Sequence, residues 1–210
     1  MQIISFTNSK YFFMEKELWY QRNQKTQNVT KKYKIRLQIW RCVDTLFFKT
    51  SLNPLSCWRI FLLKIFGAKI GKGCYISPKC TIFVPWNFEM GNFSSIDDYA
   101  YIKSRAKITI GDYVSIANFV HIIPGGHDVR SRHFDSDLAP VNIGNGAFIG
   151  ADSYIGKGVT IGEMSVIGAR SVVLKNIPEN TIAFGNPCQI RGERIPKEEY
   201  KKYRYNFIKV

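Results

Sequence analysis

The sequence of 210 residues lacks several features that would place it in other protein classes. Its five cysteines are scattered and contain no Cys-x-x-Cys pair; they are Cys42, Cys57, Cys74, Cys80 and Cys188. An odd, scattered set argues against a disulfide framework and predicts reduced thiols in a cytoplasmic protein. No signal peptide is recognisable, and the longest apolar stretch, residues 60–68, is interrupted by Lys64 and too short to cross a membrane.

Acidic residues and histidines are also scarce. The chain has 16 Asp and Glu against 30 Lys and Arg, a formal net charge of +14, and three histidines. The positive excess lies at the ends, because residues 1–72 hold 14 basic against 3 acidic residues while residues 73–190 are nearly neutral. A nucleic-acid-binding protein carries its positive charge on the folded surface, so we expect no nucleic-acid partner. The basic ends are either solvated flanks or, in the N-terminal region, a means of contact with an anionic membrane.

What the sequence has in abundance is a period of six residues. Aliphatic residues recur at this spacing, and glycine follows the first five of them; they are Ile143, Ile149, Ile155, Ile161, Ile167 and Val173. Neither the 3.6-residue period of a helix nor the two-residue alternation of a strand accounts for this spacing. It is typical of a parallel β-helix, in which six residues form one short strand and one bend. We therefore predict an all-β solenoid over residues 70–190.

The same period is present earlier in the chain, with interruptions. Runs at spacing six begin at Ile70, Met90 and Ile110, and each run is shifted by two residues from the one before. Each shift predicts a short insertion at a corner of the prism. The period is lost altogether before Ile143, where Gly, Pro and alternating charges predict a loop over residues 124–140 that projects from the prism. Long loops on a rigid solenoid are favoured sites for chemistry.

The N-terminal region, residues 1–69, contains two helical patterns. Apolar residues fall at helical spacing in two sets: Ile35, Ile39, Val43, Leu46 and Phe47, and Trp58, Phe61, Leu62, Ile65 and Phe66. Asn53 and Pro54 are the expected N-cap and first residue of the second helix, and Gly67 its end. We expect these helices to cap the open end of the prism.

An alternative for the second helix is that it lies on a membrane, with its Trp and Phe face in the lipid and Arg59 and Lys64 toward the headgroups. Residues 1–30 are polar and weakly patterned, and we expect them to be loosely packed. Residues 191–210 are expected to form a tail, with a short helix after Pro196.

His127 is the candidate for catalysis among the three histidines. It follows Pro124-Gly125-Gly126, where the chain leaves the prism, and an imidazole exchanges its proton near neutral pH. We expect His121 to be a structural or surface residue and His133 to be solvated in the loop.

Several motifs resemble those of the hexapeptide-repeat acetyltransferases, most closely the colanic-acid-type polysaccharide O-acetyltransferases. The resemblance covers roughly residues 53–192. It rests on Gly-Gly-His-Asp (125–128), Pro-Val-Asn-Ile-Gly (140–144), Ala-Phe-Ile-Gly-Ala (147–151), Val-Ile-Gly-Ala-Arg-Ser-Val-Val (166–173), Lys-Asn-Ile-Pro (175–178) and Gly-Asn-Pro-Cys (185–188). It implies a left-handed β-helix that forms homotrimers, with acetyl-coenzyme A along the prism in a cleft between subunits. The implied acceptor is a sugar hydroxyl, on a free, nucleotide-linked or lipid-linked saccharide.

The same resemblance assigns roles to particular residues. His127 matches the family's catalytic base. The Ala151 and Ala169 backbone N–H groups match donors to the reacting carbonyl and to the pantetheine arm, and Lys175 matches a basic residue near the adenosine phosphates. Phe148 stands where the family often has Trp, which keeps an apolar wall but loses the indole donor. The acceptor site is matched less well: Asp97 and Asp98 fall where some relatives place acceptor-contacting residues, and the residue that orients His127 is unassigned.

Two other functions fit a β-helix. A γ-type carbonic anhydrase has the same fold and needs three histidines around zinc, but two of the three histidines here lie in the loop, and we predict no metal site. A trimeric scaffold without catalysis is the second alternative. We expect an acetyl-coenzyme A-dependent O-acetyltransferase that acts in polysaccharide assembly.

Overall fold

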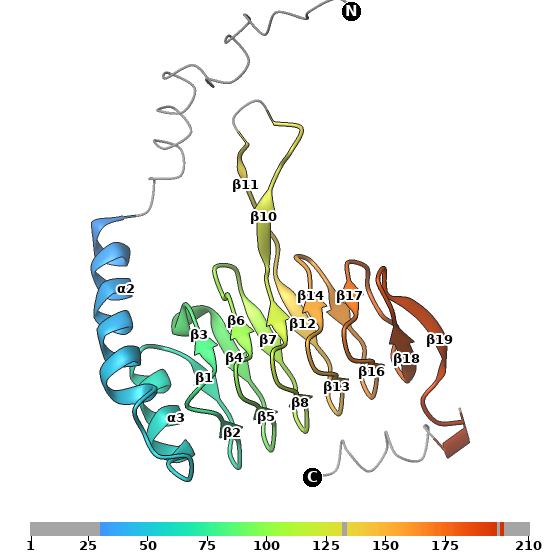
Figure 1. Cartoon of the computed structure of the whole chain (residues 1–210), viewed down its shortest axis with the longest axis horizontal. Coiled ribbons are helices and arrows are strands. Elements are labelled where there is room, and N and C mark those ends of the chain that lie inside the picture. The colour runs from blue at the N-terminus through green and yellow to red at the C-terminus, as the bar shows by residue number, and fades with distance from the viewer. Residues whose placement is uncertain (1–29, 132–133, 197, 200–210) are drawn as a thin grey trace, which may run out of the picture.

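The computed structural model describes residues 30–131, 134–196 and 198–199, and most of them form a parallel β-helix (Figure 1). The strands stack in parallel on three faces of a prism. The first face holds β1 (Lys69–Ile70), β4 (Phe88–Met90), β7 (Ile108–Ile110), β12 (Val141–Ile143) and β15 (Thr160–Ile161). The second holds β2 (Tyr75–Ile76), β5 (Ser95–Ile96), β8 (Ser115–Ile116), β13 (Phe148–Ile149), β16 (Val166–Ile167) and β18 (Thr181–Phe184). The third holds β3 (Thr81–Ile82), β6 (Tyr101–Ile102), β9 (His121–Ile122), β14 (Tyr154–Ile155) and β17 (Val172–Val173).

Three corners join these faces. We call the turn from the first to the second face the first corner, and the turn from the second to the third face the second corner. In successive coils the second corner comprises residues 97–100, 117–120, 150–153 and 168–171. The third corner leads from the third face back to the first.

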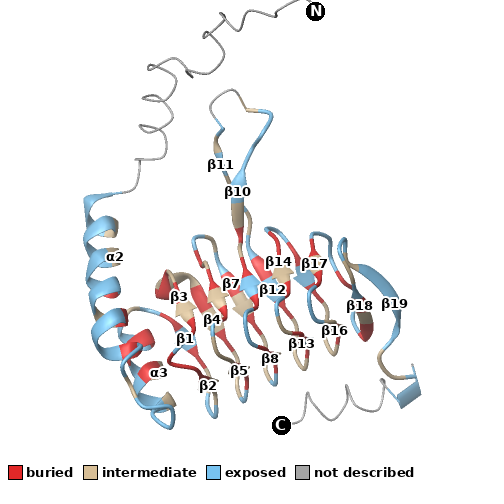
Figure 2. Ribbon diagram, in the orientation of Figure 1, coloured by how far each residue is buried: buried red, intermediate tan, exposed pale blue. Residues whose placement is uncertain are grey.

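The core is the column of aliphatic residues that the period of six predicts. Each of the six residues from Ile143 to Val173 is at most 2% exposed, and the earlier runs contribute equally buried residues such as Ile102. Burial of an aliphatic side chain of this size stabilises a fold by roughly 1.5–3 kcal/mol. The stacked coils bring these side chains together in one continuous core. Figure 2 shows this buried column inside the prism and exposed residues at its corners. The predicted solenoid is confirmed.

Coil length explains the interruptions of the period. Register partners on the first face lie 20 residues apart in an early coil, between Glu89 and Thr109, and 18 residues apart in a later one, between Asn142 and Thr160. Three hexapeptides make up the shorter coil, so the earlier coil carries two extra residues. They lie at the third corner, where the preceding coil contains the short 3₁₀ turn η3 (Pro85–Asn87). Between Thr109 and Asn142 the separation is 33 residues, because the third corner there opens into the predicted loop.

The helices lie near their predicted positions and pack on the first coil. They are α2 (Lys31–Val43), which continues into the π-helical turn η2 (Asp44–Phe48), and α3 (Ser56–Ile65). Helix α3 begins at Ser56 with Leu55 at the N-cap, so the predicted start at Asn53-Pro54 is wrong by two residues. Gly67 follows the helix with a φ of +95°, a left-handed conformation that ends helices and suits glycine.

The buried faces of the helices differ from the predicted ones. Most residues of the first predicted apolar face are exposed: Ile35, Ile39, Leu46 and Phe47. The inward side is formed instead by Trp40 and Phe48, and the Trp40 indole N–H donates a hydrogen bond to the carbonyl of Ile82, at 2.9 Å. In α3, Leu62 and Leu63 are buried, while Trp58, Phe61 and Ile65 are exposed.

Arg59 corrects the expectation that its charge faces lipid headgroups. Its side chain is fully buried beneath α3, and burial lowers the pKa of its guanidinium. The guanidinium Nε donates to the carbonyl of Ile76 at 2.6 Å, Nη1 to the carbonyl of Leu52 at 2.8 Å, and Nη2 to that of Asn53 at 2.7 Å. Arg59 therefore ties α3 to the preceding turn and to the first coil.

The far end of the prism is closed by β19 (Gln189–Glu193), which pairs antiparallel with β18 and crosses the boundary predicted at residue 190. The cysteines of the described residues are all free thiols. Within the described residues, no helix is long and apolar enough to span a membrane. The predictions for residues 1–29, for His133 and for the tail beyond residue 199 lie outside the described residues.

Candidate active site

The predicted loop is a β-hairpin that leaves the prism at the third corner (Figure 1). Strand β10 (Gly125–His127) pairs antiparallel with β11 (Ser136–Leu138), so that His127 lies opposite Ser136. The glycine at position 125 leaves room for the end of the Leu138 side chain, which lies against the base of the hairpin. Lys157 of the next coil forms an ion pair with Asp137 and holds the base of the hairpin against the prism.

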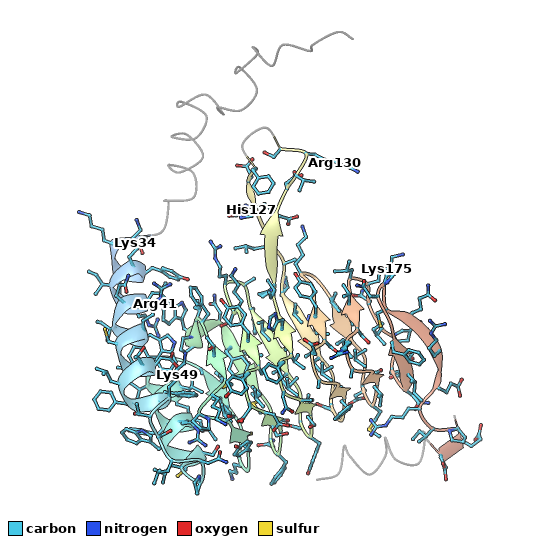
Figure 3. The ribbon with its side chains drawn as sticks, in the orientation of Figure 1. Lys34, Arg41, Lys49, His127, Arg130 and Lys175 are labelled. Carbon is cyan, nitrogen blue, oxygen red and sulfur yellow. The ribbon has the colours of Figure 1, made fainter. Side chains whose placement is uncertain are left out.

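The hairpin fixes the orientation of the His127 ring. Its Nδ1 lies 3.0 Å from the carbonyl oxygen of Phe134, and the two rings stack with centroids 4.7 Å apart and an interplanar angle of 12°. A carbonyl oxygen only accepts hydrogen bonds, so in the neutral imidazole Nδ1 carries the proton and Nε2 has the unshared electron pair. His127 is exposed, and Figure 3 shows its side chain on the hairpin, away from the body of the prism. Nε2 is therefore available to accept a proton from a group that lies outside the core of this chain.

Phe134 is the orienting partner that the sequence left unassigned. The neighbouring Asp128 does not fill that role, because its carboxylate accepts a hydrogen bond from the backbone N–H of Arg130 at 2.9 Å. The backbone N–H of Asp128 in turn donates to the carbonyl of Asp135 and extends the hairpin ladder. An aromatic residue seven positions after the histidine is the only trace of this contact in the sequence. His121, the other histidine in the described residues, is exposed on β9 against the edge of Tyr101.

The first corner is closed by a ladder of side chains. At its second position in three successive coils, the backbone N–H donates to an Asn or Asp oxygen of the next coil: Lys72 to Asn92 Oδ1, Asn92 to Asp112 Oδ1, and Asp112 to Asn145 Oδ1. The donor–acceptor distances are 2.5–2.9 Å. The backbone donors at this corner are therefore unavailable to a ligand.

The second corner is open by comparison. At the same position in its coils stand Asp98, Asn118, Ala151 and Ala169, and the backbone N–H groups of these four residues donate no hydrogen bond within the described part of the chain. Ala151 and Ala169 lie on adjacent coils, since the Arg170 N–H donates to the carbonyl of Ala151 at 2.8 Å. Half-exposed Phe148 begins the strand that leads into this corner. Exposed amide donors beside an apolar wall fit the amide and thioester groups of a coenzyme A arm.

Asp97 and Asp98 are neighbours with opposite surroundings. Asp98 accepts a hydrogen bond from the Lys79 ammonium at 2.8 Å and another from the Ser77 hydroxyl, and these bonds lower the pKa of its carboxyl. Partial burial, with the nearby Asp98 charge, raises the pKa of Asp97. No hydrogen bond or ion pair of the Asp97 carboxylate occurs among the described residues. Asp98 is thus engaged within the prism, and Asp97 is left to interact with a ligand.

A single chain does not bring all the candidate residues together. Ala151, Ala169 and Asp97 lie at the second corner. Lys175 follows β17 at the third corner, the corner from which the hairpin with His127 also leaves (Figure 3). The third face separates the two groups. The period of six does not predict this division, because it does not say which corners face each other in an assembly; only the family resemblance implies a site between subunits.

Comparison with known proteins identifies acetyltransferases built from the same six-residue repeat. A sequence-family profile described as "Bacterial transferase hexapeptide (six repeats)" matches residues 140–175. The chain is 37% identical over 164 residues to the colanic acid biosynthesis acetyltransferase WcaF of Escherichia coli, covering 78% of this chain and 90% of the relative. It is 33% identical to the galactoside O-acetyltransferase of Escherichia coli, covering 71% and 74% of the two chains.

Solved structures of acetyltransferases also share the fold of this chain. A galactoside acetyltransferase in complex with coenzyme A superposes with a TM-score of 0.74 at 28% identity, over 82% of this chain and 87% of that one. The hexapeptide-repeat acetyltransferase VCA0836 of Vibrio cholerae, in complex with acetyl-coenzyme A, superposes with a TM-score of 0.73 over 80% and 92% of the chains. Its identity is 23%, so it supports the fold.

Proposed function

The chain belongs to the hexapeptide-repeat acetyltransferases, with their left-handed parallel β-helix, and from this premise we propose that it acetylates a sugar hydroxyl with His127 as the general base. Acetyl-coenzyme A is the acetyl donor of the family. The observation that carries the proposal is the Phe134 carbonyl at His127 Nδ1, which leaves Nε2 able to accept a proton. The alternative of a carbonic anhydrase is set aside, because the relatives that share the fold and motifs are acetyltransferases.

The proposed reaction is a direct transfer. Nε2 of His127 takes the proton of the acceptor hydroxyl as its oxygen attacks the thioester carbonyl carbon, a step for which a positioned base contributes about 10²–10⁴-fold. The carbonyl oxygen becomes an oxyanion, and the Ala151 N–H donates a hydrogen bond to it. The carbon–sulfur bond then breaks, the imidazolium returns its proton to the coenzyme A thiolate, and the acetyl ester is released.

Other residues bind and position the two substrates in this proposal. The Ala169 N–H donates to the pantetheine arm, Lys175 pairs with the adenosine phosphates, and Phe148 covers the acetyl end of the arm. Asp97 accepts hydrogen bonds from acceptor hydroxyls. Asp98, which is already paired with Lys79, is withdrawn from the acceptor role that the resemblance gave to both residues.

We propose that the active form is a homotrimer in which each site is shared by two chains. The support is the separation of His127 on the hairpin from the open donors of the second corner. A partner chain whose second corner faces the hairpin would complete the site. The role in polysaccharide assembly, on the cytoplasmic side of the membrane, is proposed from the WcaF and galactoside acetyltransferase relatives.

We propose further that the N-terminal helices contact the membrane as a peripheral surface. The outward faces of α2, η2 and α3 carry large exposed apolar side chains, among them Ile39, Phe47 and Phe61. Residues 30–72 contain ten Lys and Arg against one acid, Asp44, which is paired with Lys49. An apolar face bordered by cations is typical of helices that lie on an anionic membrane, and it would bring a lipid-linked acceptor to the enzyme.

The base is tested by an acceptor screen with acetyl-coenzyme A in which thiol release is followed. His127→Ala should lower kcat by roughly 10²–10⁴ and leave the KM for acetyl-coenzyme A little changed. His121→Ala, a substitution of an exposed imidazole on the prism, is the matched control and should behave like the wild type. A loss of less than about tenfold at saturating acceptor would remove His127 from the role of base.

The shared site is tested with a second inactive variant. Ala151→Pro removes the proposed oxyanion donor, and the first coil has a proline, Pro78, at the equivalent position. This variant should keep its melting temperature and lose about 10²–10³ in kcat. When it is mixed, unfolded and refolded with His127→Ala, a site shared between chains recovers about a quarter of wild-type activity by random assembly. No recovery, in trimers of about three times 24.2 kDa, would place each site within one chain.

A further inference from the structure

The second corner carries two aromatic residues in an unusual backbone conformation. Tyr99 and Phe119 have φ values of +60° and +59°, in the left-handed region where Asn, Asp and Gly are the common residues. Their rings stack with centroids 5.0 Å apart and an interplanar angle of 9°. The side chains are 51% and 49% exposed, so they form a ridge on the surface and add little to the core. The reaction described above gives this ridge no role.

A similar pair at the first corner shows what distinguishes the ridge. Phe93 and Tyr113 also have positive φ values, +53° and +55°, and stack with centroids 5.2 Å apart. That pair adjoins the Asn and Asp ladder, in which the backbone donors are already satisfied. Stacking alone therefore does not mark a binding site.

The Tyr99–Phe119 ridge has polar groups beside it that are ready for a ligand. The carboxylate of Asp97 lies two residues before Tyr99, without a hydrogen-bond partner among the described residues. The N–H groups of Asp98 and Asn118, each next to a ridge residue, donate no hydrogen bond within the described chain. The Lys79 ammonium, which is paired with Asp98, lies 5.4 Å from the Tyr99 ring centroid and closes the end of the ridge.

We propose that the Tyr99–Phe119 ridge binds further residues of a saccharide acceptor, beyond the sugar that is acetylated. A pyranose ring has an apolar C–H face, which packs on aromatic rings, and hydroxyls at its edge, which suit carboxylate acceptors and amide donors. The proposal rests on the proposed function, because it places the acetylated sugar at Ala151 on the same corner. The proposal therefore predicts that the protein binds oligosaccharides in preference to single sugars.

The register of the coils fits a saccharide chain that runs along the corner. Asn118 lies one coil below Ala151, and Asp98 lies one coil below Asn118. Neighbouring coils are separated by the spacing of paired strands, about 4.7–4.9 Å, which is close to the length of one sugar residue in a chain. Each successive sugar would meet one coil of the corner, first at Phe119 and then at Tyr99.

The conformation of the ridge residues allows a substitution that should not disturb the fold. Tyr99→Asn with Phe119→Asn removes both rings and introduces the residue that best tolerates a positive φ. The matched control is Phe93→Asn with Tyr113→Asn at the first corner, which removes an equivalent pair. Each double variant is first checked for its melting temperature and its mass by sedimentation.

The test uses an array of saccharides from one to eight residues long, probed with labelled full-length protein, and kinetics with the best acceptor series from the acetylation screen. The wild type and the first-corner variant should bind chains of several residues at least about tenfold more tightly than the single sugar, and the ridge variant should lose that advantage. Its KM for acetyl-coenzyme A and its kcat on a single sugar should stay close to wild-type values. Array binding needs no acetylation, so failure of the proposed reaction is seen separately.

Three results would overturn the proposal. The wild type could bind long chains no better than single sugars, or the ridge variant could bind them as tightly as the wild type. The ridge variant could also lose the trimeric mass, in which case the two rings are contacts between subunits.

Discussion

The prism and the N-terminal helices use their apolar residues in opposite ways. In the prism, the residues at spacing six are all buried. In the helices, much of the regular apolar pattern is exposed, while the fully buried side chains include Trp40 and Arg59. The rule that apolar residues are buried therefore predicts the inward side chains of the prism correctly and those of the helices wrongly.

The difference follows from what decides the inward direction. In a β-helix each short strand alternates between side chains that point into a closed prism and side chains that point out, so the backbone itself separates inside from outside. In a helix, the sequence sets the apolar face, but the packing partner decides which side becomes buried. Here the inward faces are selected by hydrogen bonds to the first coil, from Trp40 to Ile82 and from Arg59 to Ile76.

The largest expected contrast between the two regions is in stability. Ile102→Ala in the third face should lower the free energy of unfolding by about 2–5 kcal/mol, because Ile102 is fully buried between Ile82 and Ile122. Phe61→Ala in α3 should change it by no more than about 0.5 kcal/mol, since Phe61 is 53% exposed. Chemical denaturation of both variants measures the contrast. A cost at Phe61 equal to that at Ile102 would mean that the helix face is buried in the native assembly.

A smaller effect is expected in membrane binding and concerns only the helices. Full-length protein should bind phosphatidylglycerol vesicles, and binding should weaken between about 0.05 and 0.5 M salt because each exposed cation contributes about 1 kcal/mol. Ile39→Ser with Phe61→Ser should reduce binding at least about tenfold through lost apolar contact and leave the melting temperature unchanged. The control is Ile190→Ser, an equally exposed substitution on β19 at the far end of the prism. Wild-type protein that ignores anionic vesicles at low salt would show that these helices serve as a cap alone.

The smallest effect separates two adjacent carboxylates within the prism. Asp98 has a lowered pKa, so its stabilising contribution is complete above the unfolded value of about 3.9 and is lost as the pH falls through the folded value. Asp97 has a raised pKa, so its ionisation destabilises the fold as the pH rises from the unfolded value of about 3.9 through the folded value. At pH 7, Asp98→Asn should therefore lower the melting temperature and Asp97→Asn should raise it slightly. Both differences should shrink toward about pH 3, and equal shifts of the same sign would contradict the assigned environments.

The sequence was sufficient for the stacked coils because the period of six is local and strict, whereas the left-handed sense of the β-helix came from the family resemblance. It located the prism, the two-residue insertions, the helices and the loop. It did not predict that the loop is a hairpin, since the pairing of His127 with Ser136 depends on a contact across the loop that carries no periodic pattern.

The candidate site was predicted in part. The position of His127 and the matches at Ala151, Ala169 and Lys175 came from the sequence, and their roles remain proposals. Phe134 as the partner of the imidazole, and the different surroundings of Asp97 and Asp98, are evident only in the folded structure. Sequence spacing fixes which corner a residue occupies, but it does not determine which side chains of neighbouring coils pair there.

The extra residues of the early coils and the hairpin all enter the prism at the third corner, and register on the faces continues across them, with Thr109 paired to Asn142. Insertions at this corner therefore leave the stacking of every coil intact. Such a scaffold separates the fold from its chemistry, because a hairpin at this corner can change in length without disturbing the buried column of the prism.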